Sequence, residues 1–283
     1  MATGILAKFL EEVGLTAFHG SPTDTKLLCL QRFIRLFAYG NSTLILALYL
    51  SALGISETRI GLFMTLTLVG DVAISFCLTL FADGVGRKVV LALGAVLMSA
   101  SGIVFALSGN YWVLLAAAIL GVISPSGNEI GPFRAIEESI LAQLTPAAVR
   151  SDVFAWYTLI GTSGTALGLL TCGWIVQHLQ SLDGWDTIRA YRIIFVLYAI
   201  FGVLKFFLAI TLSNACESES KKSVAHGPAS ETSPLLSSEA QEPSKKSVVK
   251  SLLPSISRET KLVVFKLCLL FAVDSFASGL VPS

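Results

Sequence analysis

The residues best placed to do chemistry in this sequence are acids inside long apolar segments. Asp71 lies near the middle of the apolar run 60–82, and Asp274 lies in the run 262–281. A charge in hydrocarbon costs about 2.5–3.5 kcal/mol on insertion scales, so such a residue predicts a function by default. We predict that Asp71 binds a proton or a cationic group of a substrate. The alternative is a structural hydrogen bond to another helix.

Other polar residues in apolar runs carry weaker signals. Asn41 in the first run is a further candidate for binding a proton or a solute. Glu129 lies near the end of the fourth run, where contact with water lowers the cost of its charge. Lys205 lies within the sixth run, and its long apolar stem is expected to let the ammonium snorkel toward the membrane surface.

The remaining reactive residue types predict neither an enzyme nor a metal or cofactor site. His19, His178 and His226 are far apart, and the five cysteines include no C-x-x-C pair. The formal net charge is +1, and no basic patch favours nucleic-acid binding. These residue types therefore give no support to an enzyme, a metal site or a nucleic-acid partner.

Composition places these residues in an all-α membrane protein. Of 283 residues, 54% are hydrophobic and 14% are charged, against about 25% charged in soluble domains. The mean hydropathy is +0.74. Apolar runs of about 20 residues predict membrane-spanning helices. Seven such runs occur, near Phe33–Leu53, Ile60–Ala82, Val89–Leu107, Tyr111–Ile130, Val153–Val176, Ile193–Leu212 and Leu262–Val281.

The basic residues predict the orientation of these spans. Lys and Arg are concentrated in alternate connecting segments, which places the N-terminus in the cytosol. We therefore expect a cytosolic tail over 1–26, a six-helix bundle over 27–212 and a seventh span within 259–283. The segment 213–258 is rich in Ser, Glu, Lys and Pro, a composition typical of a disordered linker.

A compact polar turn separates the second and third runs. Two glycines and two bases suit a short cytosolic loop, and each glycine is expected to permit a positive φ. The positive-inside rule does not require the acid. The turn reads Asp83-Gly84-Val85-Gly86-Arg87-Lys88.

This turn resembles the signature loop of the major facilitator superfamily, G-x-L-x-D-x-x-G-R-[RK]. Asp83, Gly86, Arg87 and Lys88 match in register, whereas Thr79 and Phe81 replace the first Gly and the Leu. The resemblance implies a six-helix N-terminal bundle built from two inverted three-helix repeats. It also implies a gate in which the acid meets a helix N-terminus of the second half.

In the same gate, the resemblance implies that Arg87 joins acids near the end of the fourth span. The local acids are Glu137, Glu138 and Asp152. Gly-Pro-Phe-Arg after the fourth span also looks like a segment of fungal and microbial permeases. Its Arg134 resembles an arginine that has been linked to proton coupling, although a positive-inside anchor explains it as well, and we favour the anchor.

Small residues in the fifth run predict close helix packing. Gly164 and Gly168 form a GxxxG pair, and Gly161 lies on the same face. The stretch faintly resembles the antiporter motif of drug–proton exchangers, but Leu169 replaces its Pro and Cys172 the first of its paired glycines. Packing is the interpretation that we favour.

The linker contains a sorting motif. Glu231, Leu235 and Leu236 match the acidic dileucine pattern E-x-x-x-L-L, which adaptor complexes read on endosomal and vacuolar cargo. Its alternative is chance similarity in a Ser- and Glu-rich segment. The motif favours a vacuolar or endosomal membrane, with the plasma membrane as the other location.

Together these features predict a secondary active transporter of a small solute that works by alternating access and is coupled to protons. The alternative is a non-transporting membrane receptor or scaffold on the same fold. Superfamily members usually have twelve spans, and this sequence ends after the seventh. We therefore expect that the 283-residue chain does not complete a transport cycle by itself.

Overall fold

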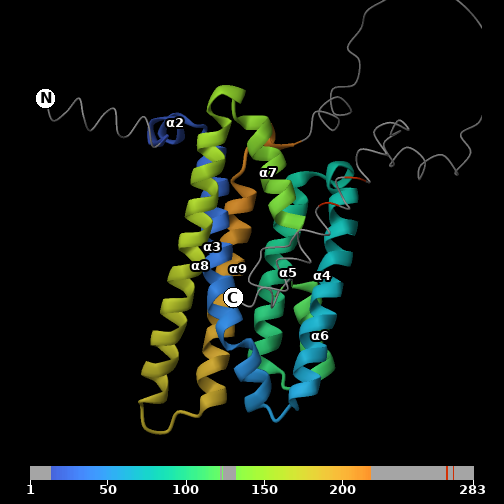
Figure 1. Cartoon of the computed structure of the whole chain (residues 1–283), viewed down its shortest axis with the longest axis vertical. Coiled ribbons are helices and arrows are strands. Elements are labelled where there is room, and N and C mark those ends of the chain that lie inside the picture. The colour runs from blue at the N-terminus through green and yellow to red at the C-terminus, as the bar shows by residue number, and fades with distance from the viewer. Residues whose placement is uncertain (1–13, 122, 124–131, 218–265, 267–269, 271–283) are drawn as a thin grey trace, which may run out of the picture. The chain divides into compact units, whose positions relative to one another are not determined.

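The computed structural model describes residues 14–121, 123, 132–217, 266 and 270, without the side chains at 77, 79–84 and 132. Within these residues every regular element is a helix (Figure 1). Five of the helices are long and apolar enough to cross a membrane. The expected all-α membrane fold is therefore confirmed, and the protein is an integral, multi-pass membrane protein.

The helices follow the apolar runs, with some shifted ends. Helix α5 begins at Arg87 and ends at Leu107, within two residues of the prediction, whereas α3 begins ten residues earlier than predicted. The polar first turns of α3 hide its start from a hydropathy reading. The helices are α2 (Leu15–Gly20), α3 (Thr23–Ala52), α4 (Glu57–Val85), α5 (Arg87–Leu107), α6 (Tyr111–Leu120), α7 (Pro132–Leu144), α8 (Arg150–Gln180) and α9 (Thr187–Ile210).

Of the fourth predicted span, Tyr111–Ile130, the structure describes a helix only over Tyr111–Leu120. Asn110 caps α6, since its side chain accepts hydrogen bonds from the N–H groups of Trp112 and Val113. Helix α7 is described from Pro132 to Leu144. Residues 124–131, which include Glu129, lie outside the described residues, as does the seventh run apart from Lys266 and Leu270.

The helix pairs follow the pattern of an inverted repeat (Figure 1). Helix α3 packs on α8 and α9, α4 packs on α6 and α7, and α5 packs on α9 and α6. The first repeat consists of α3, α4 and α5, and the second of α6–α7, α8 and α9. When each element is replaced by its counterpart in the other repeat, the same set of packed pairs results. The arrangement is the one expected for two inverted three-helix repeats.

The α5–α9 crossing shows the same symmetry in single contacts. A Cβ on Gly102 of α5 would lie 2.7 Å from the backbone nitrogen of Ala199 in α9. A Cβ on Gly202 of α9 would lie 2.7 Å from the backbone nitrogen of Ser99 in α5. In each helix the glycine lies three residues after the residue that the other helix's glycine approaches. The two helices thus make equivalent contacts, as expected for a local two-fold axis between them.

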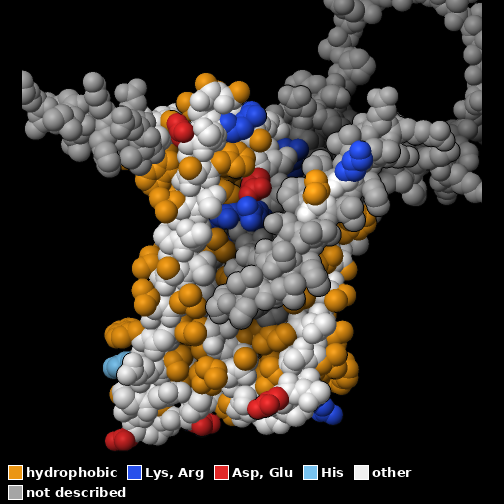
Figure 2. Space-filling view, in the orientation of Figure 1, with side chains coloured by type: hydrophobic (Ala, Val, Ile, Leu, Met, Phe, Trp, Pro, Cys, Tyr) orange, Lys and Arg blue, Asp and Glu red, His pale blue; other side chains and the backbone are white. Residues whose placement is uncertain are grey.

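Two apolar clusters fill the bundle. One surrounds Tyr49, Phe105 and Phe195, and the other lies between Leu28, Val90 and Leu141. Large apolar side chains also cover the outside, among them Leu107, Trp112, Leu170 and Trp174, which are all at least 67% exposed. Figure 2 shows such side chains along the flanks of the helices, with acidic groups at the lower end. Such an apolar flank suits lipid.

Candidate functional site

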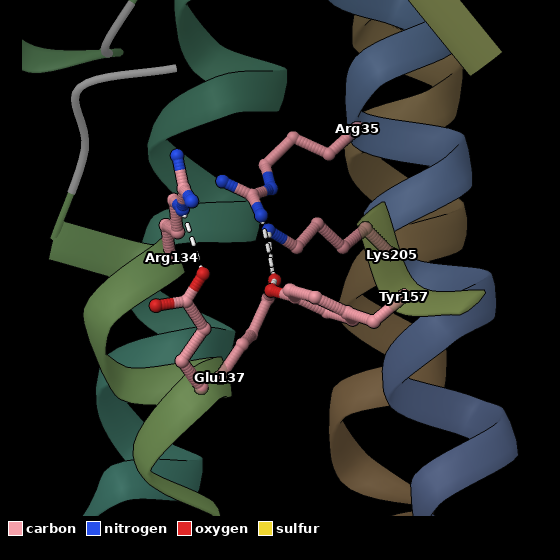
Figure 3. A network of polar contacts seen from close by, with 6 residues as sticks. Arg35, Arg134, Glu137, Tyr157 and Lys205 are labelled. Atoms are coloured by element: carbon pink, nitrogen blue, oxygen red, sulfur yellow. Dashed lines mark hydrogen bonds and ion pairs between the residues drawn. The ribbon is translucent and has the colours of Figure 1, made fainter. Parts of the chain in front are cut away.

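A buried carboxylate lies at the centre of the described bundle. Glu137 of α7 is fully buried, and its Oε2 accepts hydrogen bonds from Arg35 Nη2 at 2.6 Å and from the hydroxyl of Tyr157 at 2.7 Å. The ammonium of Lys205 lies 3.7 Å from Oε1. Figure 3 shows these side chains converging on the carboxylate from different helices. We call Arg35, Glu137, Tyr157 and Lys205 the charge cluster.

The charge cluster joins four helices. Arg35 comes from α3, Glu137 from α7, Tyr157 from α8 and Lys205 from α9. Aromatic rings complete its walls: the guanidinium of Arg32 lies 4.1 Å from the ring centroid of Tyr157, and the Lys205 ammonium lies 5.0 Å from that of Phe133. Charges taken out of water need such pairing. The cluster therefore fixes the relative positions of all four helices.

Two members of the charge cluster lie deeper than the sequence predicts. Lys205 does not snorkel, because the residue is only 1% exposed and contacts Glu137. The apolar run places Arg35 at the edge of the first span, but α3 begins at Thr23 and carries Arg35 well inside the bundle. No feature of the sequence marks Tyr157 as part of a site. The feature that could have pointed to the charge cluster is the pair Arg32 and Arg35, two bases one helical turn apart.

The signature loop is shorter than predicted. Helix α4 continues to Val85, so Asp83 and Gly84 lie in its last turn, and the prediction of a positive φ is wrong for Gly84. Gly86 does adopt a φ of 114°, which a side chain would oppose. Arg87 begins α5 and donates from Nη1 to Oε1 of Gln143 in α7 at 2.9 Å. Lys88 follows it, half-buried.

The acids expected to meet Arg87 have other contacts. Glu137 belongs to the charge cluster, and Glu138 accepts a hydrogen bond from Arg134 at 2.7 Å on an exposed face of α7. Asp152 lies at the start of α8, against Gly14. Arg87 thus reaches the predicted helix but contacts an uncharged residue there.

Asp71 and Asn41 are both buried inside the bundle. Asp71 is only 1% exposed in α4. Asn41 donates to the carbonyl of Phe37 within α3 at 2.8 Å, while its own side-chain oxygen has no hydrogen-bond partner among the described residues. Both residues therefore place a polar side chain in the interior of the bundle.

Several predicted residues cannot be compared with the structure. Glu129, Asp274 and the dileucine residues Glu231, Leu235 and Leu236 lie outside the described residues, and so does the side chain of Asp83. Within the described residues, no group of three or more His, Cys, Asp and Glu side chains could hold a metal ion.

A match to a known family extends over most of the chain. Residues 28–283 match the sequence profile of the Major Facilitator Superfamily. The chain belongs to the major facilitator superfamily. The signature loop, the inverted-repeat pairing and the apolar flanks described above are consistent with this membership.

Two relatives within the superfamily are informative. An uncharacterized membrane protein of Saccharomyces cerevisiae is 39% identical over 279 residues, which cover 94% of this chain and 60% of the relative. The quinolone resistance protein NorA of Staphylococcus aureus is 25% identical over 183 residues, or 65% of this chain and 42% of NorA. The chain therefore spans about 60% or less of the length of these relatives.

Glycines make the α3–α8 contact of this superfamily bundle. A Cβ on Gly168 would overlap the carbonyl oxygen of Phe37, and one on Gly164 would lie 2.8 Å from that of Phe33. A Cβ on Gly161 would overlap Nε of Arg32. Only glycine allows the two backbones to approach this closely. The approach also sets the depth of Arg32 and Arg35 in the bundle.

Gly168→Leu is therefore expected to destabilise the bundle by about 1–3 kcal/mol, the usual cost of overpacking. Thermal unfolding of the purified full-length protein, followed by loss of its monodisperse peak, measures the effect. Gly173→Leu is the matched control, because Gly173 lies on the same helix and a Cβ there would meet no side chain or other helix within 4 Å among the described residues. Equal stability of the two variants would contradict the packing role.

Proposed function

We propose that this protein is a secondary active transporter, which moves a small solute across a membrane by alternating access and couples that movement to protons. The observation that carries the proposal is the charge cluster, in which one buried carboxylate joins α3, α7, α8 and α9. Superfamily membership supports the same class of function.

A cluster of ion pairs suits a protein that must change conformation. The two states of a switch differ by only a few kcal/mol, so the contacts that favour one state must also break. Hydrogen bonds to a charged group have steep distance and angle requirements. A small shift of α7 relative to α3 and α9 therefore breaks the polar contacts of the charge cluster together, whereas apolar contacts weaken only gradually as helices slide. Alternating access requires such a two-state response.

The proposed coupling site is Asp71. It is a buried acid in the apolar helix α4, where a charge is costly. Uptake of a proton by Asp71 would remove a negative charge from the interior of the bundle and so shift the electrostatic balance between its two states. The proposed gate is the signature loop, whose Arg87 is hydrogen-bonded to Gln143 near the end of α7.

A non-transporting receptor or scaffold explains the site less well. Such a protein has no need of a buried acid, and each buried charge carries a cost in stability. The relative NorA is named for quinolone resistance, and an amphipathic aromatic solute of that kind is the first substrate class to test. The dileucine motif supports a proposed vacuolar or endosomal location, with a sorting adaptor as a partner.

The proposal is tested by flux in proteoliposomes that hold the full-length protein. A quinolone is added outside, and its movement and the internal pH are recorded together with and without an imposed pH gradient. Saturable solute movement accompanied by a matching proton movement is the expected result. Solute movement equal to that of protein-free liposomes, for a panel of organic anions, cations and neutral solutes, would contradict transport.

A further inference from the structure

The residues after α9 stay on the bundle and cross the ends of three helices. Leu212 and Cys216 are buried in the apolar cluster that also contains Leu28, Val90 and Leu141. A short 3₁₀ turn, Asn214–Cys216, follows Leu212 and ends at Cys216. We call residues 211–217 the strap.

One end of the strap is bound to α3. The backbone N–H of Ser213 donates to Oδ1 of Asp24 at 3.0 Å, and the Ser213 hydroxyl donates to Oδ2 of the same carboxylate. That hydroxyl also accepts a hydrogen bond from the N–H of Ala215 at 3.1 Å, which closes the turn. Asp24 is the acid in the first turn of α3.

The other end of the strap contacts the signature loop. Oε2 of Glu217 accepts a hydrogen bond from the backbone N–H of Arg87 at 3.0 Å. Arg87 is the first residue of α5, and the preceding Gly86 has no side chain to cap that helix. The first N–H groups of a helix lack intrahelical acceptors, and the helix dipole favours an anion there. Glu217 therefore caps α5 from a distant part of the sequence.

Gln143 of α7 joins the strap to the side chain of Arg87. Its Nε2 donates to the carbonyl oxygens of Ala215 at 3.0 Å and Glu217 at 3.1 Å. Its Oε1 accepts from Nη1 of Arg87 at 2.9 Å. The Gln143 amide thus contacts the strap through its nitrogen and Arg87 through its oxygen. The positions of Arg87, α7 and the strap therefore depend on one another.

We infer that the strap is a positioning element that couples the segment after Glu217 to the signature loop, holding the start of α5 and the end of α7 together while it is docked and releasing them when it detaches. The inference rests on contacts among described residues and does not depend on the proposed transport activity. Modification or binding of the sequence beyond the strap would act on Arg87 through these contacts.

The strap contains its own reporter of docking. Burial, with a further contribution from the nearby Asp24 carboxylate, raises the pKa of the Cys216 thiol from 9.0 to about 12. The thiolate is the reactive form, so a docked strap lowers the reactive fraction near neutral pH by roughly a thousandfold. The rate of maleimide labelling therefore measures how often the strap detaches.

The test uses the full-length protein in native membranes, with Cys216 as its sole cysteine and N-ethylmaleimide as the probe. Glu217→Gln and Gln143→Leu are each expected to raise the labelling rate roughly tenfold or more, because the first removes a charged acceptor of the Arg87 N–H and the second removes the donor to two strap carbonyls. Gln143→Leu leaves the charges around the Cys216 thiol unchanged, so its effect reports release of the strap. Glu217→Asp keeps the charge and is expected to stay closer to the parent rate. Asn214→Ala is the matched control, since its side chain makes no hydrogen bond in the described structure.

Two further measurements separate release of the strap from other effects. A parallel background that keeps only Cys172, buried in α8, detects global unfolding. A double-mutant cycle of Arg87→Ala with Glu217→Gln tests the coupling, because groups that share one network have non-additive effects. Faster Cys216 labelling without faster Cys172 labelling, together with non-additivity, is expected. Unchanged Cys216 labelling, parallel increases at both cysteines, or strict additivity would overturn the inference.

Discussion

Glu137→Gln is expected to destabilise the protein by about 3–5 kcal/mol, the cost of removing one partner from a buried ion pair. The glutamine has nearly the same shape, so packing is preserved. Arg35 and Lys205, however, lose the carboxylate charge that both contact at 2.6 and 3.7 Å. The loss of charge is the main effect, because the amide oxygen still accepts a hydrogen bond from Tyr157.

The adjacent residue provides the control. Glu138 is paired with Arg134, but these side chains are 31% and 45% exposed, and exposed pairs contribute only about 0–1 kcal/mol. Glu138→Gln is therefore expected to leave stability nearly unchanged. Thermal unfolding of the two purified full-length variants, at matched expression, gives the comparison. Similar melting of both would show that the charge cluster does not hold the helices together.

A second substitution tests the electrostatic cause. Lys205→Met removes one buried cation while keeping a long apolar stem, and added to Glu137→Gln it is expected to restore part of the lost stability. Lys205→Met alone is expected to destabilise the protein, because Glu137 loses a nearby cation. A double variant that is less stable than either single variant would contradict an electrostatic origin.

The membrane-spanning helices could be predicted from the sequence because the hydrocarbon thickness imposes a length and composition on each span. Gly86 was predictable too, since few other residues tolerate its φ of 114°. The charge cluster could not be predicted in this way. Arg35 and Glu137 are 102 positions apart, and only the crossing of α3 and α7 brings them together. No local pattern records that crossing.

Lys205 illustrates the same limit. A lysine in an apolar run either snorkels or pairs, and the two outcomes have the same local sequence. The choice depends on whether its helix face meets lipid or another helix. Phe133 and Glu137, both on α7, decide it here. The strap was also missed, because residues 213–217 look like the start of a polar linker.

Helix α7 connects the two sites. It carries Glu137 in the charge cluster and, six positions later in the sequence, Gln143 in the network with Arg87 and the strap. A rigid helix that shifts at one of these positions also shifts at the other. The charge cluster and the signature loop are therefore expected to respond together, with α7 as the connection between the cluster and the proposed gate.

Asp71→Asn is expected to abolish proton-coupled solute accumulation while leaving the protein folded. Asparagine keeps the shape of aspartic acid but has no proton to release, so it mimics the permanently protonated state. Exchange of solute for solute needs no deprotonation and is expected to persist. Accumulation driven by a pH gradient needs the full cycle and is expected to fall to the level of protein-free liposomes.

Both fluxes can be measured on the same proteoliposomes, with a quinolone or whichever solute the full-length protein moves. Thr67→Val is the matched control, because Thr67 is equally buried one turn earlier on α4 and its hydroxyl is bound to the carbonyl of Phe63 within the helix. It is expected to retain pH-driven accumulation. If Asp71→Asn accumulates solute with an unaltered pH dependence, the proton is carried elsewhere. If it loses exchange as well, Asp71 binds the solute or supports the helix, and proton binding alone does not describe its role.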